Sequence, residues 1–175
     1  MNETVLEKFL RYVKYDTQSS ETSGTYPSTA KQWELLHQLV KELKELGVPQ
    51  VNIDEYGYVM ATLPSNLPAT DAAFGKVPKV GIISHVDTSP SASGENVKAQ
   101  VFTYNGGDIV LPGDNAIVIR ANENLELKNN IGKTIVTTDG TTLLGADDKA
   151  GVAIIMTAIQ NFIRNPHFLH GDIQI

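Results

Sequence analysis

Hydrophobic residues recur at helical spacing in the first part of the chain. They fall every three or four positions between charged side chains, at Val5, Leu6, Phe9, Leu10 and Val13. This pattern predicts an amphipathic helix that ends near Tyr15. A second stripe, from Trp33 to Leu46, begins after Pro27 and stops at Gly47, so it predicts a second helix. The polar residues 16–25 between the helices are typical of a loop, which either connects them in solvent or reaches a site.

Shorter β-branched runs predict strands in the middle of the chain. Residues 51–63 predict two strands around a turn at Gly57, and the proline-containing residues 64–78 predict a surface loop. The run from Lys79 to Val86 is almost uninterrupted in its apolar character, which is typical of a strand buried on both faces of a mostly parallel sheet. We therefore expect this strand at the centre of the domain.

The last part of the chain carries weaker signals and then a third helix. Residues 97–104 and 134–138 predict short strands, and residues 111–133 between them indicate only strand and loop. A helical stripe then runs from Val152 to about Arg164. Helices that alternate with strands in this way predict an α/β fold.

A histidine and an aspartate end the predicted central strand. His85 and Asp87 lie at its carboxyl end, which is the end at which open α/β sheets bind ligands. Because side chains alternate along a strand, residues 85 and 87 project to the same side. The carboxylate can then fix the tautomer of the imidazole and leave its other nitrogen for a metal or a proton. Alone, a His-x-Asp pair is more often incidental than functional.

Two adjacent aspartates precede the third helical stripe. Asp147 and Asp148 stand between Gly145 and Gly151 at the start of the helix, where the backbone dipole favours negative charge. A plain helix cap accounts for one aspartate well and for the second only partly. Phosphate-binding loops are excluded, because their glycine patterns are absent and paired carboxylates repel phosphate. A carboxylate on such a turn can bridge two divalent ions, so a metal site is the alternative to a cap.

The composition of the chain limits its possible binding partners and metal ligands. The chain has 175 residues and a net charge of −6, and its lysines and arginines are dispersed, so we expect one domain that does not bind nucleic acid. It has no cysteine, so any metal must be held by histidine and carboxylate. The first residues lack the pattern of a signal peptide and no apolar run could span a bilayer. We therefore expect a soluble cytoplasmic protein with no membrane contact.

Together the two polar stretches form a more specific pattern. His85-Val-Asp87-Thr88 and Leu144-Gly-Ala-Asp147-Asp148-Lys149-Ala-Gly151 resemble the co-catalytic zinc aminopeptidases and carboxypeptidases of the M20 metallopeptidase family. Residues 58–64, 137–151 and 163–172 are similar to the tripeptide aminopeptidases of that family, so the resemblance covers the whole chain. It implies an α/β catalytic domain with three layers, in which a mixed sheet carries helices on both faces.

The resemblance also implies a role for each site residue. His85 would ligate one Zn²⁺ ion, Asp147 would bridge two, and Asp87 would orient the imidazole of His85 without touching the metal. Asp148 matches the motif without being a ligand in the family, where its peptide bond with Asp147 tends to be cis. Each complete site would hold two zinc ions, although histidine and carboxylate ligands also suit Mn²⁺ or Co²⁺.

The family pattern extends beyond residues 1–175. In the family a Glu-Glu pair, which includes the general base, follows the strand that begins here at Gly171, and the remaining ligands and the lid domain come later. Residues 1–175 thus resemble the N-terminal portion of the catalytic domain, without its C-terminal part and without the lid. We expect the full protein to be a homodimer, joined through that lid, that removes the N-terminal residue from tripeptides. We expect residues 1–175 alone to be inactive.

Two other hypotheses also fit the sequence. The chain could be a non-catalytic α/β domain of the same fold that serves in binding or assembly, or both motifs could be incidental. Metal binding that depends on His85 would argue against a purely structural role. His37, within the second predicted helix, is expected to be structural or solvated. His167 and His170 match no family ligand and are expected to be ordinary surface histidines.

Overall fold

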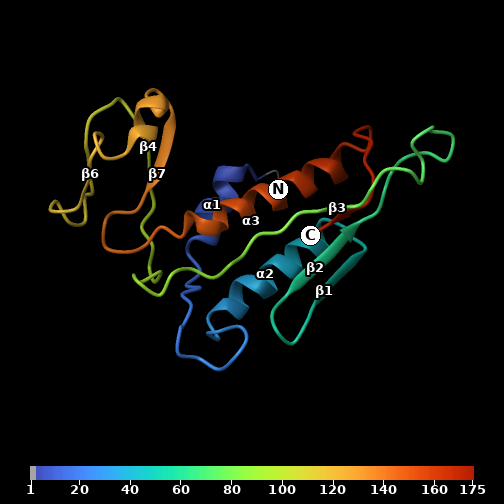
Figure 1. Cartoon of the computed structure of the whole chain (residues 1–175), viewed down its shortest axis with the longest axis horizontal. Helices are drawn as coiled ribbons and strands as arrows, with labels where there is room; N and C mark the ends of the chain where they lie inside the picture. The colour runs from blue at the N-terminus through green and yellow to red at the C-terminus, as the bar shows by residue number, and fades with distance from the viewer. Residues whose placement is uncertain (1–2) are drawn as a thin grey trace.

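Residues 3–175 are described by a computed structural model, in which three α-helices and a four-stranded mixed sheet form the main body (Figure 1). The helices are α1 (Val5–Tyr12), α2 (Gln32–Glu45) and α3 (Ala146–Arg164). All three confirm the helical stripes of the sequence. The start of α1 is fixed by a capping box, in which Thr4 and Glu7 exchange hydrogen bonds between side chain and backbone.

The sheet of the main body runs in the order β1-β2-β8-β3. Its strands are β1 (Gln50–Ile53), β2 (Val59–Leu63), β3 (Val80–Gly81) and β8 (Ile173–Gln174). β1 and β2 form the expected antiparallel pair around a turn, β2 pairs antiparallel with β8, and β3 pairs parallel with β8. The sheet is therefore mixed, as an α/β fold of this kind requires.

The position of β3 differs from the expectation. The sequence predicted a strand over residues 79–86 at the centre of the sheet, buried on both faces, and this prediction is wrong for residues 3–175. Only Val80–Gly81 is strand, it lies at the edge of the sheet, and the side chains of Val80 and Ile83 are 51% and 92% exposed. An apolar run indicates that a segment can form a buried strand. Whether other strands pair with it on both sides depends on distant parts of the chain, which the run itself does not show.

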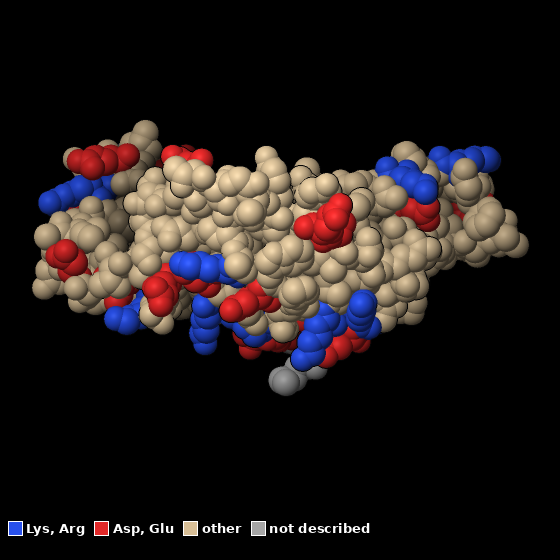
Figure 2. All heavy atoms as spheres, turned by 90° about the horizontal axis from the view of Figure 1, so that it is seen from below, with Lys and Arg blue, Asp and Glu red and all other residues tan. Residues whose placement is uncertain are grey.

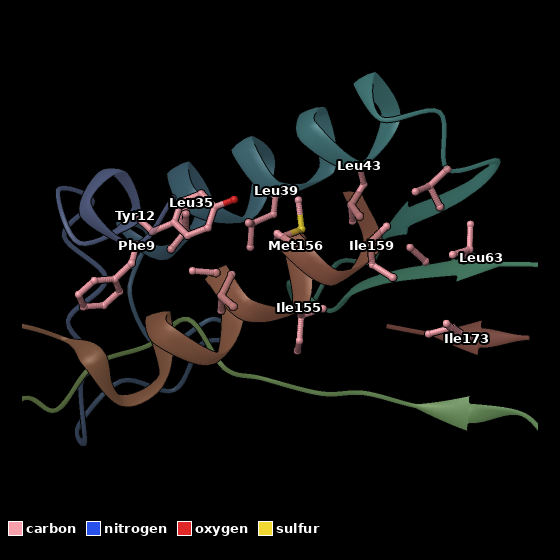
Figure 3. Packing of buried hydrophobic residues seen from close by; sticks show 14 of the residues in the cluster. Phe9, Tyr12, Leu35, Leu39, Leu43, Leu63, Ile155, Met156, Ile159 and Ile173 are labelled. Atoms are coloured by element: carbon pink, nitrogen blue, oxygen red, sulfur yellow. The ribbon is translucent and has the colours of Figure 1, made fainter. Parts of the chain in front are cut away.

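The helices cover one face of the sheet. Along β2, Ala61 and Leu63 are buried while Met60 is 62% exposed, and in β8 Ile173 is buried while Gln174 is exposed. Because side chains alternate along a strand, the buried residues lie on one face and the exposed residues on the other. Figure 3 shows the buried face meeting residues of all three helices in one cluster. The opposite face carries no helix among residues 3–175, so the third layer implied by the resemblance stays a prediction.

A smaller unit, residues 100–137, lies beyond the first turn of α3 (Figure 1). We call it the satellite unit. It contains a pair of two-stranded sheets and a 3₁₀ helix: β4 (Gln100–Thr103) with β7 (Thr134–Thr137), β5 (Ile109–Val110) with β6 (Val118–Ile119), and Leu125–Asn130. Tyr104, Ile109 and Leu111 form a separate small core within it. The expected strands are confirmed, whereas the polar 3₁₀ helix had no apolar stripe to indicate it.

The surface agrees with the dispersed charges of the sequence. Figure 2 shows acidic and basic side chains interspersed along the face in view, with no uniformly basic area that would attract a polyanion. Among the helices of residues 3–175, none combines the length and the apolar character that crossing a bilayer requires.

A buried carboxylate joins α1 to α2. Glu42 on α2 accepts hydrogen bonds from the guanidinium of Arg11, from the hydroxyl of Tyr12 at 2.6 Å and from the amide of Gln38 at 2.7 Å. Burial opposes the ionisation of Glu42, but these three donors outweigh it and hold the pKa of its carboxyl below the ordinary value. The ionised carboxylate therefore contributes to the stability of the helix pair.

Glu42→Gln should lower the free energy of unfolding by about 1–3 kcal/mol at pH 7, because the amide is a weaker acceptor for its three donors, of which Tyr12 is buried. The native pKa of Glu42 lies below its unfolded value, so its contribution is present above the unfolded pKa of about 4.3 and is lost as the pH falls further. Urea unfolding of both proteins should show a gap that narrows in acid. The exposed Glu45→Gln is the matched control and should change stability by less than about 0.5 kcal/mol.

Candidate metal centre

The two polar motifs of the sequence meet in the structure. The Nε2 atom of His85 lies 3.1 Å from Oδ1 of Asp147. On the other side of the ring, Nδ1 lies 3.1 Å from both the carboxylate and the backbone carbonyl of Asp87. His85, Asp87 and Asp147 are thus brought together, with the imidazole between two carboxylates.

The surroundings of His85 favour a positive charge at its position. Partial burial would lower the pKa of His85, but acceptors from Asp87 and Asp147 outweigh this effect and raise the pKa above its ordinary value. With Nδ1 directed at Asp87, Nε2 is the nitrogen that can exchange its proton for a metal ion. The same two carboxylates that stabilise a proton on the ring would also stabilise a cation bound at Nε2.

The separation of the two donor atoms fits a shared metal ion. Zinc binds histidine nitrogen and carboxylate oxygen at about 2.0–2.2 Å, so two donors on one tetrahedral ion lie about 3.3 Å apart. The observed 3.1 Å between His85 Nε2 and Asp147 Oδ1 is close to this value. The side chain of Asp147 is 95% exposed, which leaves room for a second ion on the same carboxylate.

Residues 3–175 provide only part of such a centre. Within this part of the chain, no three side chains of histidine, cysteine, aspartate or glutamate are grouped so that they could hold a metal ion together. Asp87 is directed at the ring of His85 rather than at the point between His85 and Asp147. The described residues therefore fit a zinc ion as two of its ligands and one orienting carboxylate.

The turn that carries Asp147 has an unusual backbone. Gly145 has φ +75°, and the peptide bond between Asp147 and Asp148 is cis, as the resemblance implied. Both aspartates depart from helical geometry, so the regular helix begins after Asp148. Asp147 thus lies outside the regular helix, and its carboxylate lies beside the ring of His85.

Asp148 has a structural role that explains the second aspartate of the motif. Its carboxylate accepts a hydrogen bond from the amide of Gly151 at 3.1 Å, which caps the first turn of the helix. The same carboxylate accepts a hydrogen bond from the hydroxyl of Ser84 at 2.6 Å. Since Ser84 directly precedes His85, Asp148 connects the aspartate turn to the segment that carries the histidine.

Several supporting residues were not found from the sequence. Ser84 and Thr17 are ordinary polar residues there, and only their contacts reveal them: Thr17 is fully buried and its hydroxyl donates to the carbonyl of Val86 at 2.6 Å. Lys149 belongs to the recognised motif but had no assigned role. It is 1% exposed, burial lowers its pKa to about 8, and it donates to the carbonyl of Tyr15 at 2.7 Å.

His37 and His167 are exposed as expected, whereas His170 is partly buried rather than an ordinary surface residue. His37 is exposed on α2 and stacks on Trp33 with ring centroids 5.4 Å apart. His167 is exposed beside Phe168, and the partly buried His170 contacts the ring of Phe162.

Gly145→Ala should destabilise the protein more than a glycine substitution in open space. A side chain at φ +75° is strained by about 1–2 kcal/mol, and the added Cβ would also lie 3.1 Å from Cγ2 of the buried Thr88. Gly47→Ala is the matched control, because Gly47 has φ +86° with nothing within 4 Å of its Cβ position. Urea unfolding should show a loss at least about 1 kcal/mol larger for Gly145→Ala, and equal losses would show that the turn does not pack tightly on Thr88.

Known proteins with similar sequences were found along almost the whole chain, although no family model matches it. The chain is 53% identical over 172 residues to "Peptidase T" of Halothermothrix orenii and 53% identical over 174 residues to that of Clostridium acetobutylicum. It is 49% identical over 176 residues to the Geobacillus thermodenitrificans protein of the same name. The alignments cover 98%, 99% and 100% of this chain, and 41% of each relative.

A solved structure has the same fold. The crystal structure of a tripeptidase from Staphylococcus aureus matches with a TM-score of 0.58 and 24% sequence identity, over 97% of this chain and 34% of that protein. The chain thus spans well under half the length of the proteins it matches. The resemblance inferred from the two motifs is confirmed at the level of the named relatives: along nearly its whole length, this chain is similar to part of peptidase T.

Proposed function

We propose that residues 1–175 form part of an M20-type metallo-aminopeptidase that removes the N-terminal residue from tripeptides. The observation that carries this proposal is the meeting of His85 Nε2 and Asp147 Oδ1 at 3.1 Å, with Asp87 on the other ring nitrogen. The names of the relatives, peptidase T and a tripeptidase, support peptide hydrolysis as the reaction.

Each residue of the centre has a specific task in this proposal. His85 and Asp147 would bind a zinc ion, Asp147 would bridge to a second one, and Asp87 would hold the imidazole so that Nε2 faces the metal. Bound zinc, or Mn²⁺ or Co²⁺ in its place, would polarise the scissile carbonyl and lower the pKa of a water molecule. Asp148 would keep the carboxylate of Asp147 in place through its own bonds to Ser84 and Gly151.

The rest of the proposal concerns the part of the relatives that this chain does not match. Two ligands cannot complete a tetrahedral site, and a carboxylate base must accept a proton from the attacking water. We expect the missing ligands, the base, the helices on the open face of the sheet and the dimer-forming lid in that part. The proposed protein would be cytoplasmic, and residues 1–175 alone would be inactive.

The second candidate is a non-catalytic domain of the same fold. It is favoured by one observation, namely that residues 3–175 do not bring a third metal-binding side chain to His85 and Asp147. The two candidates make different predictions for a protein that contains the remaining ligands. Peptide hydrolysis requires His85 and Asp147 under the first candidate and does not under the second.

A graft tests this difference directly. This chain replaces the matched segment of the peptidase T of Halothermothrix orenii, and release of the N-terminal residue from a tripeptide is measured in the presence of zinc. The graft should be active. His85→Ala and Asp147→Ala should abolish activity because each removes a ligand, and Asp87→Asn should reduce it about 10–100-fold because the imidazole loses its orienting carboxylate.

The control variant in the graft is His167→Ala, which removes an exposed histidine and should leave activity unchanged. Residues 1–175 alone should release no amino acid under the same conditions. Full activity of the His85→Ala and Asp147→Ala grafts would contradict the proposed function, and turnover by residues 1–175 alone would contradict the proposed incompleteness.

A further inference from the structure

A short segment after α1 runs alongside the segment that follows β3 and carries His85. We call residues 15–19 the splint. The amide of Thr88 donates to the carbonyl of Thr17 at 3.1 Å, and the amide of Ser19 donates to the carbonyl of Thr88 at 2.9 Å. With the bond from the Thr17 hydroxyl to the carbonyl of Val86, these contacts fasten the splint on both sides of Asp87. Thr17 and Thr88 are 0% and 2% exposed, so these bonds are shielded from water.

The same splint is fastened to α3 by one side chain. Lys149 lies two residues after Asp147, its side chain is almost completely buried, and its ammonium donates to the carbonyl of Tyr15 at 2.7 Å. The ammonium passes close to the aspartate turn, since a Cβ on Gly145 would lie 3.6 Å from it. The segment that holds His85 and the helix that carries Asp147 are thus joined through residues 15–19.

The charges around Lys149 do not amount to an ordinary ion pair. Asp16, on the splint, is near enough to act on Lys149 electrostatically. The carboxylate of Asp16 is itself bonded to the ammonium of Lys31 at 2.5 Å and to the amide of Gln18 at 3.1 Å. Burying an ammonium costs free energy, and an apolar side chain of similar volume in its place is often neutral or stabilising. An apolar residue at position 149 would therefore stabilise the fold about as well as the lysine does, so stability alone does not explain why a lysine is found there.

We propose that Lys149 is a positioning residue for the metal centre, which ties the aspartate turn to the splint and thereby sets the separation of Asp147 from His85. The inference rests on the proposed function, because it concerns the same two ligands. It adds a second connection to the bond between Asp148 and Ser84. That bond joins the turn to the residue before His85, whereas Lys149 acts through residues that hold the chain after His85.

The test measures the affinity of the graft for Co²⁺ by titration of the His85 ring resonances, which a paramagnetic ion shifts and broadens. The graft is used because residues 1–175 alone supply only two ligands. Lys149→Met keeps the volume of the side chain and removes its hydrogen bond. We expect it to raise the Kd for Co²⁺ about tenfold, as is typical when a supporting contact of a metal ligand is lost. Asp147→Ala removes a ligand and gives the Kd for Co²⁺ that is expected when the metal centre is lost.

A second pair of variants tests the other end of the connection and serves if Lys149→Met does not fold. Thr17→Val removes the hydroxyl that donates to Val86 and should raise the Kd, whereas Thr17→Ser retains the hydroxyl and should not. Lys8→Met is the matched control, because Lys8 on α1 is also a buried lysine but pairs with Glu3, just before the helix, at 3.4 Å. It should change stability without changing the Kd.

The outcomes separate the two proposals. If Co²⁺ binding depends on Asp147 and weakens in Lys149→Met and Thr17→Val but not in Lys8→Met, the positioning role is supported. If binding depends on Asp147 but is the same in Lys149→Met and Thr17→Val as in the unaltered chain, the inference is overturned and the metal centre stands. If Co²⁺ does not perturb His85 through Asp147, the metal centre itself is overturned, and the inference with it.

Discussion

The contact between the imidazole of His85 and the carboxylate of Asp147 is the constraint on which the arrangement of this chain depends. The two residues are 62 positions apart, and the satellite unit lies between them in the sequence. Holding two donor atoms within about 3.3 Å across such a span requires rigid supports on both sides. On one side α3 packs against α1 within the hydrophobic core, and on the other the splint and the bond from Ser84 to Asp148 hold the segment that carries His85.

The supports explain why so many polar groups near the centre are buried. Thr17, Thr88 and Lys149 are almost inaccessible to water. The hydroxyl of Thr17 and the ammonium of Lys149 donate to backbone carbonyls, and Thr88 is held through its backbone amide and carbonyl. Backbone acceptors have fixed positions, so bonds to them transmit the geometry of one segment to the next. The exposed side chains of His85 and Asp147 can therefore be held in place by buried neighbours that never contact a ligand.

Local signals allowed the helices, the first strand pair and both polar motifs to be predicted, because helical stripes and turn residues are properties of adjacent positions. The position of β3 was not predictable, since Val80 has the same apolar character in an edge strand as in a central one. Residues 16–25 were left between two interpretations, and the structure shows that Thr17 and Ser19 lie against residues 86–88, next to His85. Ser84 and Lys149 acquire their roles only through partners that are distant in the sequence.

The most direct test of the account is the position of zinc in the graft of this chain into peptidase T. Anomalous scattering at the zinc edge from crystals of the graft would locate the ions without reference to activity. The account predicts one ion within about 2.0–2.2 Å of both His85 Nε2 and a carboxylate oxygen of Asp147. Zinc bound elsewhere, with His85 still hydrogen-bonded to Asp147, would contradict it.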